Sequence, residues 1–300
     1  MNWKNVFLMG MVTLLPLSIS AQANILNAKK PEEIGIKTEA QKKVDNDAPL
    51  PYGYVDDRDI LWSKTVWEII DLDERINFPL YYPIDTIDIG PDRRSLYDVL
   101  IKNIKNGKLQ DVYVDSYFTE KRKFSDLQAT LQKTDTTDAG YEQYNAGEQI
   151  SAEYINRRAL TAADIKEYMI KGIWYFDKRQ GELKYRLLGI SPVAPDVNFI
   201  DNDAMSTDDA KVPLFWVWYP SAREILHEAK VFNQRNSAQP ISFDMLLNAR
   251  RFNAVIYKED NVHGDRLIKD YIADNSLFQL LEAKRIQEVI RDKEQDMWAY

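Results

Sequence analysis

The chain has 300 residues with 47 acidic and 39 basic side chains, so its formal net charge is −8, and it contains no cysteine. The acidic balance argues against a surface for nucleic acid or anionic lipid, since both need clustered positive charge. The lack of cysteine excludes disulfides, thiolate metal sites and a cysteine nucleophile, so packing must supply the stability.

The N-terminus has the pattern of a secretory signal peptide. Lys4 supplies a positive charge, Val6–Leu17 is apolar and uncharged, and small residues follow. The apolar run is shorter than the roughly 20 residues of a spanning helix, although an uncleaved anchor is the alternative. We predict a signal peptide over residues 1–21 and export to the periplasm. Residues 22–51 are polar and charged with few apolar side chains, which predicts a flexible tail.

The region predicted to fold spans residues 52–300. Near its start, Trp62, Val66 and Ile69 have the spacing of one helical face, which favours a helix. Trp67 interrupts this stripe, so a strand is the alternative.

The next elements have clearer local patterns. Ser95 is placed to cap a short helix, and Gly107 is placed to end it. Val112–Phe118 is rich in β-branched and aromatic residues, which predicts a strand. Residues 132–152 are polar, which predicts a surface loop or a boundary between two subdomains.

A similar order of elements follows this loop. Thr161–Asp164 predicts the start of a helix that Gly172 ends. Ile173–Phe176 and Leu183–Ile190 predict two strands, and the turn at Arg179–Glu182 between them predicts a β-hairpin.

The last third alternates strands and helices. Leu214–Trp218 is apolar on both faces, which predicts a covered strand, and Pro220 is placed to begin a helix. Ser242–Leu247 predicts a short helix, Ala254–Tyr257 a strand, and residues 265–298 one or two amphipathic helices. The predicted class is therefore α+β: short helices alternate with strands of a mixed sheet, after a flexible N-terminal tail and before an amphipathic C-terminal helix.

Motifs for catalysis and metal binding are incomplete in this sequence. His227 and His263 are the two histidines, and neither belongs to an H-E-x-x-H motif. Asp201 begins a segment like a calcium loop, but Ser206 replaces the required glycine and Val212 the bidentate acid. We therefore predict no enzymatic activity and no cofactor. Clustered acids and aromatics leave a periplasmic hydrolase or a peptidoglycan-binding module as the alternative.

Aromatic side chains are conspicuous, and most of them should form the core. Tryptophan and tyrosine also anchor protein interfaces, and paired arginines among acids are suited to ion pairs with a partner. The candidate interface residues are Trp62, Trp67, Tyr81, Tyr82, Trp216, Trp218, Arg250 and Arg251.

Eight segments resemble the GldN/PorN family. They are, in chain order, Leu61–Trp67, Ile69–Asp71, Asn77–Pro83, Pro213–Pro220, Ala222–Leu226, Ser242–Phe252, Ile256–Val262 and Asp265-Arg266. The resemblance covers residues 52–271. It implies a periplasmic structural component of the type IX protein secretion and gliding motility machinery of Bacteroidota, and it carries no catalytic residues.

The resemblance also implies the protein partners. They are an outer-membrane lipoprotein of the GldK/PorK type, with which the protein self-associates into a ring, and the periplasmic part of an inner-membrane protein of the GldM/PorM type. No direct membrane insertion is expected, so the protein would lie at the outer membrane through its lipoprotein partner. The signal-peptide pattern and the lack of a cysteine to carry lipid fit this location.

Overall fold

The computed structural model describes residues 30, 32, 43–45, 47–87, 89, 93–149, 151–197, 211–233, 236 and 240–298. The predicted signal peptide, residues 1–21, lies outside them, as do most of the predicted tail and the segment that begins at Asp201. The chain divides into two compact units, Met1–Ala48 and Pro49–Tyr300. The elements below belong to the second unit.

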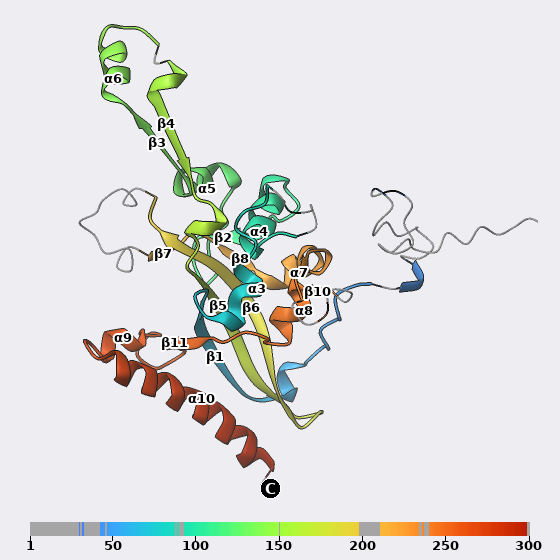
Figure 1. Cartoon of the computed structure of the whole chain (residues 1–300). Coiled ribbons are helices and arrows are strands. Elements are labelled where there is room, and N and C mark those ends of the chain that lie inside the picture. Colours follow the sequence, from blue (N-terminus) through green and yellow to red (C-terminus); the bar gives the residue numbers. More distant parts are fainter. Residues whose placement is uncertain are drawn as a thin grey trace, which may run out of the picture. The chain divides into compact units, whose positions relative to one another are not determined.

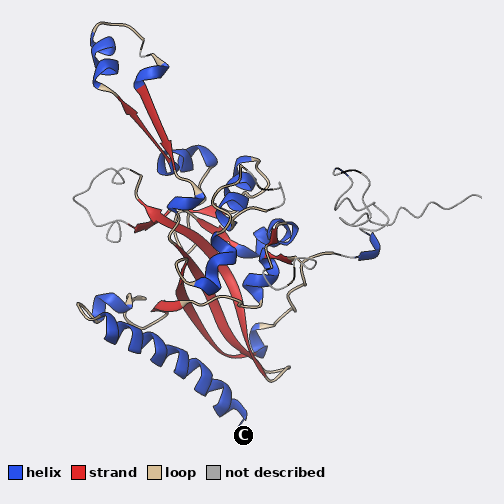
Figure 2. Cartoon of the chain, viewed as in Figure 1, coloured by secondary structure: helices blue, strands red, loops and turns tan. Residues whose placement is uncertain are grey.

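A seven-stranded sheet lies at the centre of this unit (Figures 1 and 2). Its strand order is β11 (Val255–Glu259), β1 (Ile60–Asp71), β5 (Glu167–Asp177), β6 (Glu182–Pro195), β8 (Trp216–Trp218) and β2 (Val112–Tyr113), and β7 (Lys211–Pro213) pairs with β6. The predicted α+β class is confirmed. The strand pairs are antiparallel, however, where a mixed sheet was predicted. Neighbours such as β5 and β6 are joined by a tight turn, which suits an antiparallel pair.

One row of paired residues across the sheet shows where the core lies. Its members are each at most 2 % exposed: Ile256, Glu68, Ile170, Ile190, Val217 and Val112. The helices that pack on the β5, β6 and β8 part of this row are α4 (Leu96–Lys105), α7 (Tyr219–Glu228) and α8 (Phe243–Asn248). At the β11 end, Ile256 packs instead with Ala283, Ile286 and Ile290 of α10 (Ser276–Trp298).

The helix predicted from Trp62 is wrong, because Ile60–Asp71 forms strand β1. Trp67, which interrupted the helical stripe, points to the opposite face of the sheet from Val66 and Glu68, and all three are buried. A strand that is covered on both faces loses the alternation of apolar and polar residues that would identify it.

Elements with local start and stop patterns are confirmed. The Ser95 hydroxyl accepts a hydrogen bond from the backbone N–H of Asp98 at 3.2 Å and caps α4, which ends before Gly107 at a φ of +69°. Ser242 caps α8 in the same way. The β5–β6 hairpin turns at Gly181, where φ is +64°. The C-terminal segment forms α9 (Ile268–Tyr271) and α10.

Two predicted elements are shorter than expected. The helix predicted from Thr161 is one 3-10 turn, Ala162–Asp164, and β5 begins soon after it. The backbone N–H and the hydroxyl of Thr161 both donate to Asp164, at 2.8 Å each, which satisfies that turn without a longer helix. The strand predicted over Val112–Phe118 ends at Tyr113, because the chain turns back at Phe118 with a φ of +60°.

The polar segment predicted as a loop at residues 132–152 belongs to a regular substructure, which we name the arm, residues 132–159. In the arm, β3 (Gln132–Thr136) pairs with β4 (Ile155–Ala159). The turn between these strands contains α6 (Asp138–Asn145) and a 3-10 turn, Ala152–Tyr154. The remaining described elements of the unit are 3-10 turns Asp57–Asp59 and Arg75–Asn77, helices α3 (Phe78–Tyr81) and α5 (Phe124–Leu131), and strands β9 (Lys230–Val231) and β10 (Ile241–Ser242).

Candidate interaction site

A second row of paired residues lies beside the buried row, on the opposite face of the sheet. Its members are Lys258, Trp67, Lys171, Gly189 and Trp218, from β11 to β8. Directly paired residues point to the same face, so two lysines flank the Trp67 ring. Their Nζ atoms lie 4.4 Å (Lys258) and 4.9 Å (Lys171) from a ring centroid of Trp67. Both distances are those of a cation–π contact.

The loop between β2 and α5 covers this row and is fastened to both lysines. The Nζ of Lys171 donates to the Ser116 carbonyl oxygen at 2.9 Å. The Nζ of Lys258 donates to the Tyr117 hydroxyl at 2.7 Å, and that hydroxyl donates to Asp265 at 2.9 Å. The lysines therefore hold the loop on the sheet rather than presenting free charges.

Burial shifts the pKa values of the two lysines and of Tyr117. It lowers the pKa of Lys171 and of Lys258, and the charge of Lys258 lowers the pKa of Lys171 further. Burial, with the hydrogen bond to Asp265, raises the pKa of Tyr117 to about 12. The phenol therefore stays neutral at physiological pH and keeps its role as a hydrogen-bond donor.

Gly189 makes room for the loop in this row. A Cβ atom at position 189 would lie 2.5 Å from Cζ of Phe118, whose ring packs edge-on against Trp218 with centroids 4.8 Å apart. We expect Gly189→Ala to lower the free energy of unfolding by about 1–3 kcal/mol through overpacking. Urea unfolding would measure the loss. Gly53→Ala is the control, because nothing lies within 4 Å of a Cβ there, and equal stability of the two variants would contradict the expectation.

Glu68 and Arg250 form an ion pair inside the molecule. The guanidinium donates to both carboxylate oxygens, at 2.8 and 2.9 Å, and its carbon lies 4.1 Å from the ring centroid of Tyr185. Burial acts to lower the pKa of Arg250, but the hydrogen bonds and charge of Glu68 raise it above its ordinary value. The pair neutralises the one charged side chain of the buried row.

Asp244 is the centre of a second buried network. Its carboxylate accepts hydrogen bonds from Nε and Nη2 of Arg223 at 2.9 and 3.1 Å, from the Tyr219 hydroxyl at 2.8 Å, and from Nδ2 of Asn248 at 2.8 Å. The network joins α7 to α8. Sequence reasoning missed it, although its four members lie in segments that resemble the GldN/PorN family.

The start of the second unit is tied to this network. Nη2 of Arg223 donates to the Leu50 carbonyl oxygen at 2.6 Å, and the Tyr52 ring centroid lies 4.0 Å from the guanidinium carbon. The Tyr52 hydroxyl donates to Asn248 at 2.8 Å. Residues 50–52 are therefore fastened to α7 and α8.

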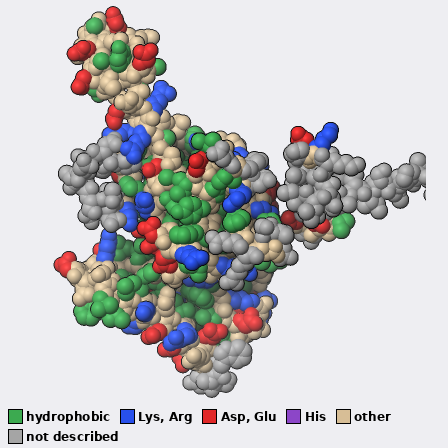
Figure 3. Space-filling model, in the orientation of Figure 1, with side chains coloured by type: hydrophobic (Ala, Val, Ile, Leu, Met, Phe, Trp, Pro, Cys, Tyr) green, Lys and Arg blue, Asp and Glu red, His purple; other side chains and the backbone are tan. Residues whose placement is uncertain are grey.

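An apolar groove of about 490 Å³ lies between the edge strand β11 and helices α9 and α10. Its apolar lining includes Ile69, Met169, Val255, Leu267, Ile268 and Leu280. Leu277, Phe278 and Leu281 are exposed on the same end of α10. Figure 3 shows hydrophobic side chains at the surface in this region. An uncovered apolar surface of this kind is a candidate site for binding a partner.

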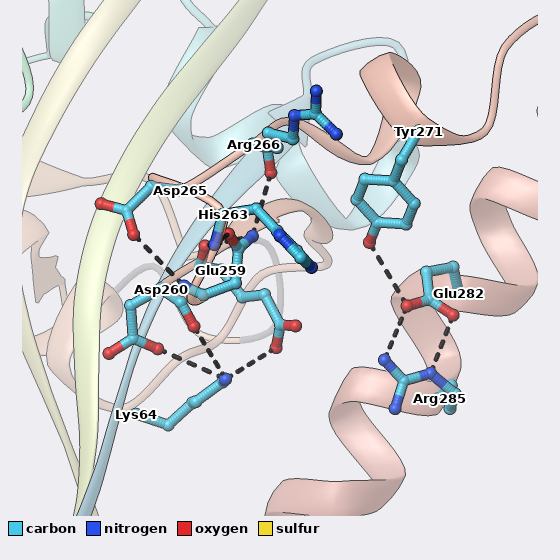
Figure 4. A network of polar contacts seen from close by, with 10 residues as sticks. Lys64, Glu259, Asp260, His263, Asp265, Arg266, Tyr271, Glu282 and Arg285 are labelled. Carbon is cyan, nitrogen blue, oxygen red and sulfur yellow. Dashed lines mark hydrogen bonds and ion pairs between the residues drawn. The ribbon is translucent and has the colours of Figure 1, made fainter.

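Polar contacts hold the elements around the apolar groove (Figure 4). Lys64 of β1 forms ion pairs with Glu259 at 3.0 Å and Asp260 at 3.4 Å, at the end of β11. The Tyr271 hydroxyl of α9 donates to Glu282 of α10 at 3.3 Å. Hydrogen bonds from Arg285 hold the pKa of Glu282 below its ordinary value, so this carboxylate is ionised at neutral pH. The walls of the groove are thus fixed by contacts within the chain.

The candidate interface residues from the sequence lie in several places. Trp67 and Trp218 belong to the second row of paired residues, which contains the two lysines. Trp67 and Trp216 are buried. The rings of Tyr81 and Tyr82 pack against each other with centroids 4.9 Å apart. Arg250 is engaged with Glu68. Tyr82 and Arg251 are exposed, and Trp62, Tyr81 and Trp218 are partly buried. None of the eight lines the apolar groove.

Within the part of the chain that the structure describes, no group of three or more histidine, aspartate or glutamate side chains is placed to bind a metal ion. Among the same residues, no helix combines the length and the apolar content that crossing a bilayer requires. His227 lies on α7, and His263 lies in the loop after β11.

Comparisons with known proteins identify the family. No curated protein matches the chain. A scan against protein families matches residues 55–299 to the family described as "Gliding motility associated protein GldN", which is not known as a family of enzymes. The matched residues include the seven-stranded sheet, the arm and the elements around the apolar groove. Because the match covers most of the chain, the protein belongs to the GldN family and is a component of the gliding motility and type IX secretion machinery.

Proposed function

We propose that the protein is a non-enzymatic structural subunit of this machinery in the periplasm. It assembles with an outer-membrane lipoprotein of the GldK/PorK type into a ring and contacts the periplasmic part of a GldM/PorM-type protein. The apolar groove is the observation that carries the proposal, because an uncovered groove with fixed walls is suited to a protein partner. The signal-peptide pattern at residues 1–21 supports the periplasmic location.

The lipoprotein is the partner that we assign to the apolar groove. Exposed leucines around a preformed groove can be buried by apolar side chains of a partner without first reorganising this chain. Trp62, Tyr82 and Arg251, which retain exposed surface, are proposed as further contacts. Large apolar and arginine side chains of this kind contribute much of the binding energy at protein interfaces.

Charged substitutions in the apolar groove, at Leu280, and beside it, at Leu277, test this assignment. We expect Leu277→Asp with Leu280→Asp to reduce recovery of the lipoprotein by at least about tenfold, since burying an unpaired carboxylate is unfavourable. The tagged full-length protein would be affinity-purified from detergent-solubilised envelopes, and co-purifying proteins would be identified by mass spectrometry.

Val262→Asp is the matched control, because Val262 is 95 % exposed and lies outside the groove lining. This variant should recover the lipoprotein normally. Undiminished recovery with the doubly substituted groove would refute the assignment of the groove. Recovery of the unaltered protein alone and as a monomer would refute its role as an assembly subunit.

A further inference from the structure

The apolar groove lies along the free edge of the seven-stranded sheet. Among the described strands, β11 has one neighbour, β1, and is thus an edge strand (Figure 1). Consecutive residues of a strand point to opposite faces, so Val255 and Ile256 face different sides of the sheet. Val255 pairs with Ile69, whereas Ile256 belongs to the buried row on the other face. Both line the groove, which therefore passes across the outer edge of β11.

Part of this edge is open. An antiparallel bridge joins Lys258 to Leu267, so the chain itself covers the edge at Lys258. Val255–Tyr257, which precede that bridge, line the groove. No strand among the described residues pairs with their outer side, and Val255 is 37 % exposed. A strand edge of this kind presents backbone N–H and C=O groups to which a further strand can pair.

The groove beside this edge is lined by apolar side chains. Ile69 and Met169 are paired across β1 and β5 and continue the row of Val255. Leu267 and Leu280 line the groove from the segments that form α9 and α10. When a peptide adds to a sheet as a strand, its main chain pairs with the edge and its alternate side chains enter pockets beside that edge. The side chains that enter this groove would therefore be apolar.

A positive charge lies at one end of the groove. Among the described residues that line it, Lys269 is the one with a charged side chain. Lys269 is exposed, and its ammonium group forms no hydrogen bond or ion pair with another described residue. It also lines, with Ser276 and Gln279, a polar hollow that continues the groove and contains Asp274. An apolar groove that ends at an unpaired ammonium group is complementary to an apolar segment that carries a carboxylate.

We propose that the lipoprotein binds here through an extended segment that adds to β11 as a further strand, with apolar side chains in the groove and a carboxylate at Lys269. The inference rests on the proposed function, because it states the chemistry of the partner segment at the same groove. A helix in this place would bury the open edge of β11 without pairing it, since the main-chain groups of a helix are bonded to each other. An added strand pairs that edge.

A photo-cross-linking residue in the groove identifies the segment. The tagged full-length protein with p-benzoylphenylalanine in place of Leu280 would be irradiated in intact cells, and the cross-linked peptide would be identified by mass spectrometry. We expect a lipoprotein segment whose alternate residues are apolar, with an aspartate or glutamate on the same side. The same residue in place of Val262, which is 95 % exposed and outside the groove lining, is the control and should give background only.

Backbone methylation tests the pairing with β11. A synthetic peptide of the cross-linked segment would be titrated into the purified full-length protein and followed by fluorescence anisotropy. N-methylation of every second amide should weaken binding by at least about tenfold in one register and change it little in the other, because alternate amides of a strand face its neighbour. An equal effect in both registers would refute strand addition.

Charge reversal tests the role of Lys269. Lys269→Glu should reduce recovery of the lipoprotein by about tenfold, since like charges then meet. Lys284→Glu makes the same change at an exposed position of α10 outside the groove lining, and it should leave recovery unchanged. Replacing the acidic residue of the cross-linked segment with lysine should restore recovery with Lys269→Glu. Misfolding of the variant would not be repaired by that second change.

The outcomes separate this inference from the proposed function. A lipoprotein segment without alternating apolar residues or without an acidic residue would overturn strand addition, and the proposed function would stand. A cross-link from the groove to a second copy of this chain would overturn strand addition and the assignment of the groove, while recovery of the lipoprotein would keep the assembly role. Loss of both the cross-link and the recovery of the lipoprotein with the unaltered groove would refute both.

Discussion

Asp244→Ala should lower the free energy of unfolding by about 3–5 kcal/mol, because it leaves the Arg223 guanidinium buried without a counter-charge. Both side chains are largely buried, and the carboxylate is the acceptor of four hydrogen bonds from Arg223, Tyr219 and Asn248. Equilibrium unfolding in urea, followed by circular dichroism, would measure the loss.

The same variant should also loosen residues 50–52, since Arg223 holds the Leu50 carbonyl oxygen and stacks on Tyr52. Limited proteolysis would show this as faster cleavage near Leu50 under native conditions. Glu224→Ala is the matched control, because Glu224 is the next residue on α7 and is exposed. It should change the stability by less than about 0.5 kcal/mol. A loss no greater than that of this control would contradict the role given to Asp244.

Arg250→Ala should be destabilising to a similar extent, by about 3–5 kcal/mol, because it leaves the Glu68 carboxyl group in the core without its counter-charge. Glu68 is 1 % exposed and lies in the buried row between Ile256 and Ile170. The adjacent Arg251 is exposed. Arg251→Ala is therefore the control, because it removes the same type of side chain from a position that is not buried. Urea unfolding of the two alanine variants should differ by several kcal/mol.

Removing both charges provides a second check on this pair. The double variant Glu68→Met with Arg250→Met should recover most of the stability that Arg250→Ala loses, since apolar side chains of similar volume often replace a buried ion pair at little cost. If the double variant were as unstable as Arg250→Ala, packing around Tyr185 rather than the unpaired charge would explain the loss.

Local patterns predicted much of the fold. The cap at Ser95, the short helix that begins after Ser242 and the turn within Arg179–Glu182 each depend on residues that are close in sequence, and each forms as predicted. The β1 strand could not be distinguished from a helix, because its burial on both faces depends on β5, β11 and the elements that cover them. Its spacing of apolar residues alone matched a helix better.

Long-range pairing explains why the candidate site was less predictable. Glu68 and Arg250 are 182 positions apart in the chain, and no spacing rule joins them. The amphipathic pattern of residues 265–298 predicted α9 and α10, but it could not show that Leu277 and Leu280 stay uncovered while Ile286 is buried. Likewise, the polar composition of residues 132–152 concealed a ribbon whose strands are held together by backbone hydrogen bonds.

The pairing of β1 with β11 has a consequence for how the protein is made. A nascent polypeptide emerges N-terminus first, so β1 must wait for almost the whole sequence before its second neighbour arrives. Until then one edge of β1, with the Glu68 carboxylate still lacking its arginine, stays open to water. This delay leaves a hydrophobic strand edge to which chaperones can bind until the C-terminal third of the chain is made.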